Sequence, residues 1–154
     1  MTIASAVCNT FKTEVLRAVH NFTVSGSGGN AFKLALYTSS ANLSKSTTAY
    51  ATNPGGGGNT EITNTSGSAY SAGGIALTSV TPALSTDTAC CDFADVSFTS
   101  ASFTANGCLI YNDTASGDPA VCSIAFGGDK TVSSGTFTIQ FPTADASNAI
   151  LRIA

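Results

Sequence analysis

The sequence predicts an all-β domain, either an antiparallel β-sandwich or a jelly-roll-like barrel, with one short N-terminal helix. Three observations indicate this fold class. Short apolar segments alternate with polar residues after residue 74, turn-forming residues separate these segments, and helical periodicity is confined to the start of the chain. The chain has 154 residues. We therefore expect residues 1–154 to form a single β-domain with one core.

The N-terminal helix is predicted over about residues 7–20. Phe11 and Val15 belong to an apolar stripe that recurs at three- and four-residue spacing. Asn9 or Thr10 could cap the start of this helix. A helix this short is marginal in isolation, so its apolar stripe must dock on the sheet or on a neighbouring subunit.

The strands are predicted from period-two alternation of apolar residues. They are expected at residues 31–37, 74–81, 89–97, 102–104, 107–112, 120–126, 136–141 and 149–153. Turn signals are expected at residues 106–107, 117–119, 127–129 and 134–135. Pro82 is expected to stop the second of these strands, and the alternation slips at residues 94–95, which predicts a bulge there.

A long loop rich in Gly, Ser and Thr is predicted over about residues 38–74. It contains Pro54 and the glycine run 55–58, and it has few bulky apolar residues. Structureless segments of this length are uncommon inside compact domains and usually serve as functional arms or mobile loops. We expect part of the loop to become ordered only against a partner.

The composition excludes several classes of protein. Apolar residues make up 43% of the chain, whereas charged residues make up only 10% and give a net charge of −3. The six basic residues are scattered, so the concentrated basic face that nucleic-acid binding requires is missing. No stretch approaches the roughly 20 apolar residues of a membrane span. Uncharged polar groups suit a surface that meets other proteins, because they hydrogen-bond without the cost of burying charge.

No catalytic or cofactor-binding pattern is found. His20 is the only histidine, and we expect it to be a partly exposed residue near the helix C-terminus. The adjacent cysteines 90–91 would point to opposite faces of a strand, and the glycine run 55–58 has no following helix or Lys-Ser/Thr pair. Asp92 and Asp95 are three residues apart on a strand, hence on opposite faces unless a bulge realigns them. We expect no enzyme activity, no metal and no cofactor.

The five cysteines suggest one candidate disulfide. Cys108 and Cys122 lie on consecutive predicted strands, and a hairpin centred near Ala115 would place them opposite each other. The alternative is two buried thiols that pack as small apolar side chains. Cys8, near the N-terminus, is a candidate for the odd thiol that links subunits.

Eight segments together carry a resemblance to a known family. They are FKTEVLRAVHNF (11–22), FKLALYTSSANL (32–43), YSAGG (70–74), DFADVSF (92–98), GCLIYN (107–112), FGGDKT (126–131), FTIQFP (137–142) and AILRI (149–153). Over nearly its whole length the chain resembles a family of small virion structural proteins of tailed bacteriophages. It departs from that pattern at its cysteines, where Ala or Val is usual. The resemblance carries no catalytic motif.

The resemblance implies a protein made in the host cytoplasm and located in the virion. The leading hypothesis is a capsid decoration (cement) protein, a homo-oligomer that contacts the major capsid protein or other virion proteins. The first alternative is a tail, collar or fibre-base protein. The second alternative is a carbohydrate-binding module, in which Tyr37, Tyr50, Tyr70 and Tyr111 would serve as stacking platforms.

Overall fold

The computed structural model describes residues 2–63 and 70–154. Over this part of the chain the protein is mostly β, with 47% strand and 7% helix, two antiparallel sheets and one short α-helix. This confirms the predicted all-β sandwich. The elements are β1 (Ala6–Val7), α1 (Asn9–Leu16), the 3-10 turn η1 (Ser25–Ser27), β2 (Phe32–Tyr37), β3 (Ile75–Leu77), β4 (Ser79–Ser85), β5 (Thr88–Phe93), β6 (Val96–Asn112), β7 (Ala120–Ile139) and β8 (Leu151–Ile153).

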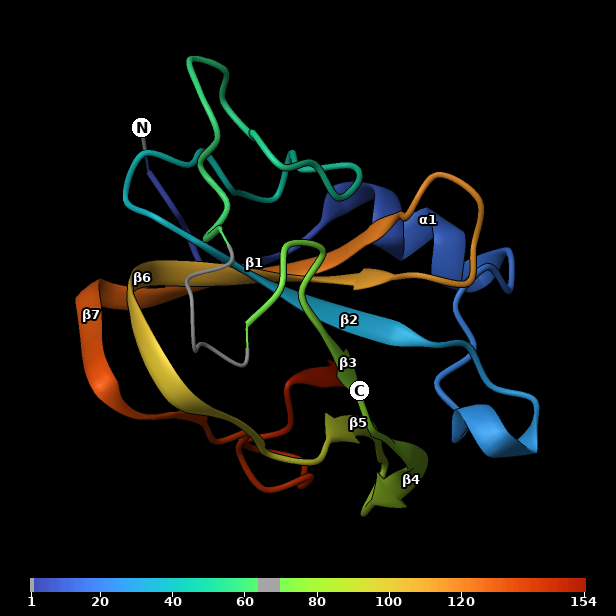
Figure 1. The fold of residues 1–154 in the computed structure, drawn as a ribbon. Coiled ribbons are helices and arrows are strands. Elements are labelled where there is room, and N and C mark those ends of the chain that lie inside the picture. The colour runs from blue at the N-terminus through green and yellow to red at the C-terminus, as the bar shows by residue number, and fades with distance from the viewer. Residues whose placement is uncertain (1, 64–69) are drawn as a thin grey trace.

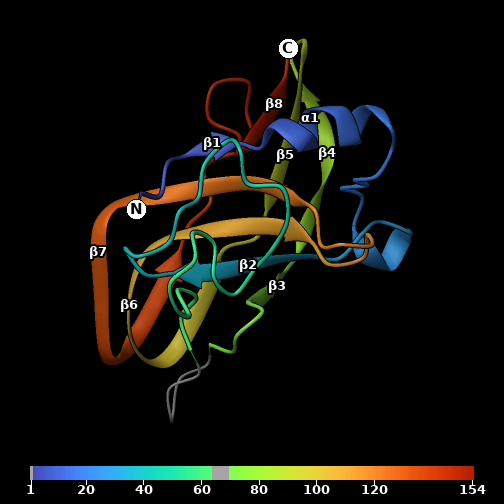
Figure 2. The ribbon, with the colours of Figure 1, turned by 90° about the horizontal axis from the view of Figure 1, so that it is seen from above.

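The larger sheet has the strand order β1-β7-β6-β2-β3, and the smaller sheet has the order β4-β5-β8. β6 and β7 are much longer than the other strands, with 17 and 20 residues. They run together across the molecule, bend sharply at one side and return, so that one hairpin spans both layers of the fold (Figure 1). α1 and the smaller sheet lie at the same end of the molecule (Figure 2), and Figure 1 shows them at different heights, with α1 above the sheet.

The core is centred on β2, which pairs with β6 on one side and β3 on the other. Phe32 and Leu36 at its two ends are fully buried. The ring of Phe32 stacks on Phe22 at a centroid distance of 4.4 Å and contacts Phe93 at 5.7 Å. Aromatic residues from the segment after α1, from the larger sheet and from the smaller sheet therefore meet at one point.

Three predicted turns are wrong, because the strands continue through them. Residues 106–107 lie within β6, and residues 127–129 and 134–135 lie within β7. The register of the pair shifts at several positions instead, one of them between Ala105 and Gly107. Gly127 and Ser134 have φ of 74° and 47°, conformations that β-bulges accept without ending the ladder. The turn at residues 117–119, between β6 and β7, is confirmed.

Pro82 does not stop the strand that contains it. β4 runs through Pro82, and its register against β5 shifts between Val80 and Ala83. β4 is an edge strand of the smaller sheet, so a proline at this irregularity costs few ladder hydrogen bonds. The slip predicted at residues 94–95 separates two strands, β5 and β6, rather than forming a bulge within one.

α1 is shorter than the predicted helix over residues 7–20. Its end has the hydrogen bonds of a Schellman motif, in which the Val19 N–H donates to the Glu14 carbonyl at 3.0 Å and the Ala18 N–H donates to the Val15 carbonyl at 3.2 Å. Ala18 has a φ of 57°, the left-handed conformation that ends helices and that usually selects glycine. The apolar spacing that continues past Ala18 therefore belongs to extended chain.

Several described residues of the loop over 38–74 pack on this domain itself, among them the buried Ala41, Leu43 and Thr60. The expectation that part of the loop becomes ordered only against a partner stays a prediction. Glu61 is only 2% exposed. Its carboxylate accepts hydrogen bonds of 2.7 Å from the hydroxyls of Tyr50 and Tyr70 and from the Gly73 N–H. One buried carboxylate thus joins both parts of the loop. Residues 64–69, which the prediction also covered, lie outside the described residues.

None of the helices in the described ranges is long and apolar enough to span a membrane.

Candidate functional site

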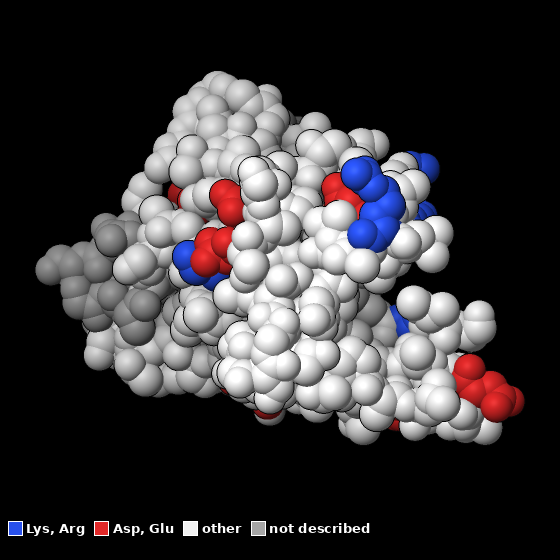
Figure 3. Space-filling model, turned by 90° about the vertical axis from the view of Figure 1, so that its right-hand side faces the viewer, with Lys and Arg blue, Asp and Glu red and all other residues white. Residues whose placement is uncertain are grey.

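A groove of about 870 Å³ lies between α1 and the smaller sheet. Phe11, Val15 and Leu16 of α1 line one wall, and Ala89 and Ile153 of the smaller sheet line the other. We call this feature the α1 groove. Figure 3 shows this side of the molecule hollowed between an upper part that carries Lys and Arg side chains and a projecting lower part that ends in acidic side chains.

Large apolar side chains are exposed around the α1 groove. Leu16, Leu84 and Ile153 are 87%, 74% and 66% exposed. Leu84 lies opposite Ala89, and Ala89 lies opposite Ile153, so these three residues form one row across a face of the smaller sheet. The row extends the apolar surface of the groove toward the β4–β5 hairpin. Contiguous exposed apolar surface of this kind marks sites of protein–protein contact or ligand binding.

Charges of opposite sign lie at the two sides of this surface. The basic side chains that line the groove are Lys12, His20 and Arg152, and within the described lining there is no carboxylate. Arg17 is exposed at the end of α1, whereas Asp87 is exposed at the tip of the β4–β5 hairpin. The side near α1 is therefore cationic and the hairpin tip is anionic, in a chain that carries few charges overall.

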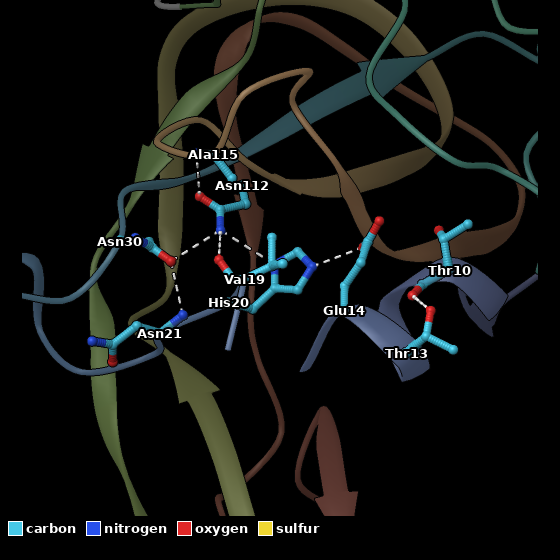
Figure 4. A network of polar contacts seen from close by, with 9 residues as sticks. All are labelled: Thr10, Thr13, Glu14, Val19, His20, Asn21, Asn30, Asn112 and Ala115. Atoms are coloured by element: carbon cyan, nitrogen blue, oxygen red, sulfur yellow. Dashed lines mark hydrogen bonds and ion pairs between the residues drawn. The ribbon is translucent and has the colours of Figure 1, made fainter. Parts of the chain in front are cut away.

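His20 is buried, not partly exposed as predicted, and it follows α1 rather than belonging to it. Its Nε2 lies 3.0 Å from a carboxylate oxygen of Glu14, and its Nδ1 lies 3.3 Å from Nδ2 of Asn112 (Figure 4). The amide nitrogen of Asn112 can only donate, so His20 Nδ1 accepts from it and His20 Nε2 donates to Glu14. Both ring nitrogens are therefore engaged in contacts within the fold.

Asn112 is the centre of this network. It is fully buried at the end of β6, and its Nδ2 also lies 3.2 Å from the Val19 carbonyl and 3.0 Å from Oδ1 of Asn30. Its Oδ1 accepts from the N–H groups of Thr114 and Ala115. The network ties the segment after α1 to the turn between β6 and β7. It therefore fixes the wall of the α1 groove.

The carboxylates considered for chemistry have local structural contacts. Asp92 Oδ1 accepts from the Phe93 N–H, and Asp95 Oδ1 accepts from the Phe141 N–H, both at 2.8 Å. Across the described residues, no three His, Cys, Asp or Glu side chains gather in a way that could hold a metal ion.

The cysteines are buried free thiols. Cys108 lies opposite Ile124, and Cys122 lies opposite Ile110, so the candidate disulfide partners are two residues out of register and are not paired. No pairing is centred on Ala115 itself, because Tyr111 lies opposite Ala120 and the register shifts further between Ile110 and Tyr111. The two residues are buried free thiols, which is the alternative given for them above. Cys8 is fully buried as the N-cap of α1. It is therefore not placed to link subunits, and neither Asn9 nor Thr10 is the cap.

The tyrosines do not form stacking platforms for a sugar. Tyr37, Tyr70 and Tyr111 are at most 2% exposed. Tyr50 is partly buried, because its ring stacks on Tyr111 at 4.6 Å and its hydroxyl donates to Glu61. This arrangement removes the basis for the carbohydrate-binding hypothesis.

The sequence did not point to Leu16, Leu84 or Ile153. Leu16 lies off the apolar stripe of the helix. An apolar residue on the polar side of a short helix is exposed unless a partner covers it, so its position could have indicated a contact surface. Leu84 lies outside the predicted strands, and Ile153 fitted the alternation of its strand. Only the tertiary arrangement shows that their common face is uncovered.

No protein-family model, no curated protein and no solved structure matches this chain, so the sequence and the geometry of the α1 groove alone indicate its function.

Proposed function

We propose that this protein is a structural component of a bacteriophage virion, and specifically a capsid decoration (cement) protein that stabilises the shell through protein–protein contacts. The observation that carries the proposal is the apolar surface around the α1 groove, where Leu16, Leu84 and Ile153 are exposed on an otherwise well-packed domain. The resemblance over nearly the whole chain supports the virion as its location.

The low charge of the chain suits this role. With 10% charged residues, most of the surface can be covered by another protein with little cost in charge desolvation. A decoration protein is held by several such contacts at once, so contacts that are weak individually become strong together. The partners in this proposal are the major capsid protein, other virion proteins and further copies of the chain.

Quantitative mass spectrometry of density-purified particles tests the proposal. A copy number that matches the capsomers of the shell supports the decoration role, whereas a copy number that matches the tail or collar proteins supports the tail alternative and overturns the decoration role. Absence of the protein from purified particles overturns both.

A second experiment tests the stabilisation itself. Particles stripped of the protein should release their DNA at a lower temperature than complete particles, and adding back the wild-type protein should restore the original release temperature. Stripped particles that retain full heat resistance would contradict the cement function.

A further inference from the structure

We propose that the face around the α1 groove pairs with the same face of a second copy of the chain, forming a two-fold dimer in which each β4–β5 hairpin packs against α1 of the other copy. The inference rests on the proposed function, since it names one of the partners of that structural protein.

The apolar part of this face lies between two projecting features. Leu16 stands on α1, and Leu84 stands near the tip of the hairpin, with the row through Ala89 and Ile153 between them. In an isolated copy, all three large side chains are more than half exposed. A second copy turned by two-fold symmetry brings Leu84 of each copy toward the apolar wall formed by α1 of the other.

The charges make the face complementary to itself. Lys12 on α1 and Arg17 at its C-cap are exposed, whereas Glu14 of α1 is directed to His20. At the other end, Asp87 occupies the two-residue turn that follows the Ser85 pairing with Thr88. A two-fold rotation places the anionic tip of each copy against the cationic helix of the other (Figure 3). A partner with a single sign of charge would match only one of these two sides.

The first test compares apolar variants of the whole protein by sedimentation equilibrium. We expect wild type to be a dimer, and Leu16→Glu and Leu84→Glu each to raise the dimer dissociation constant roughly tenfold or more. Val24→Glu is the matched control, because Val24 is 37% exposed and belongs neither to the groove lining nor to the row of Leu84, Ala89 and Ile153. It should leave the constant unchanged. Thermal unfolding of each variant, followed by circular dichroism, establishes that the fold is retained.

The second test exchanges the charges. Asp87→Arg and Arg17→Asp should each weaken the dimer, and the double variant should recover most of the lost affinity, because the unlike pair is restored with its signs reversed. Asp129→Arg, on the exposed middle of β7, is the control and should have no effect.

Two outcomes overturn the inference. One is a wild-type protein that remains monomeric at millimolar concentration, and the other is a dimer that none of the four face substitutions weakens. Neither outcome contradicts the proposed virion role, because the copy number in purified particles tests that role separately. A monomer present at capsomer stoichiometry would mean that the groove face is covered by a different virion protein.

Discussion

The hydroxyl of Tyr70 donates a hydrogen bond of 2.7 Å to Oε1 of Glu61, and both side chains are almost completely buried. The same hydroxyl accepts from the Leu36 N–H at 2.9 Å, so the contact connects the long loop to the central strand β2. A buried carboxylate is tolerated when donors surround it. Among the described residues, the donors to Glu61 are the hydroxyls of Tyr50 and Tyr70 and the N–H of Gly73.

Replacing Glu61 should therefore destabilise the fold according to how many donors lose their acceptor. Glu61→Ala leaves three donors without the carboxylate and should lower the free energy of unfolding by about 3 kcal/mol or more. Glu61→Gln keeps one oxygen for Tyr70 and Gly73, while the Tyr50 hydroxyl can rotate to accept, so its cost should be about 1–2 kcal/mol. Urea unfolding measures both values, and equal stability of the two variants would contradict this account.

Asn112 should be equally sensitive to the loss of its donor group. In Asn112→Asp, a carboxylate faces the Val19 carbonyl and Oδ1 of Asn30, and no donor remains between these oxygens. We expect the free energy of unfolding to fall by about 2–4 kcal/mol. Asn42→Asp is the control, since Asn42 is exposed. Chemical denaturation of both variants is the measurement, and a change of similar size in the two would rule out a special role for the amide.

Ala18→Gly should stabilise the protein. Ala18 holds a φ of 57° at the end of α1, where an L-residue is strained and glycine is not. The expected gain is about 0.5–1 kcal/mol, after the larger chain entropy of glycine in the unfolded state is subtracted. Ala76→Gly in β3, where the backbone is extended, should instead destabilise by a similar amount. Melting temperatures that fall in both variants would show that the helix end is not strained.

The thiols should be unreactive in the folded protein. Burial raises the pKa of Cys8 to about 11 and the pKa of Cys108 to about 12, from an ordinary value of 9.0. Because the thiolate is the reactive form, a thiol-specific reagent at about pH 8 should modify these residues only after denaturation. Rapid labelling of Cys8 in the native protein would contradict its buried position.

The same pKa shifts predict the direction of the alkaline stability change. In the unfolded chain the thiols ionise near pH 9, whereas in the folded protein Cys8 and Cys108 hold their protons until about pH 11–12. Their contribution to stability is therefore fully present below pH 9 and is lost as the pH rises through 11–12. Urea midpoints should fall progressively above pH 9, and Cys108→Ala should make this fall shallower. A urea midpoint that rises between pH 9 and pH 12 would contradict the raised pKa values of these thiols.

The sequence predicted the fold class and the central strands because their signals are local. The alternation of Phe32, Leu34 and Leu36 is visible without any tertiary information, and the turn at residues 117–119 is marked by Gly and Pro. The glycines and serines inside β7 gave the same signal, but there they bend a continuous strand. Whether such a residue ends a strand or kinks it depends on the partner strand, which sequence spacing does not encode.

The hydrogen-bond networks of Glu61 and Asn112, and the α1 groove, depend on long-range packing. Glu61 and Asn112 stand in segments without periodicity, so no pattern distinguished them from surface residues. Their roles come from partners such as Tyr70, Gly73 and His20, which are brought close only by the fold. The α1 groove likewise forms between the first helix and the last strand, which are far apart in the sequence. Local sequence patterns cannot show that these two elements face each other.

The curled β6–β7 hairpin restricts how this protein can change in evolution. Over the first part of β6 the side chains alternate between buried and exposed positions, and the register shifts in the hairpin set which residues are buried. Inserting or deleting one residue there would turn the buried face outward over the remainder of a strand that serves both layers. Changes in length should therefore accumulate in the turn at residues 117–119 and in the glycine run at 55–58, while the hairpin varies by substitution alone.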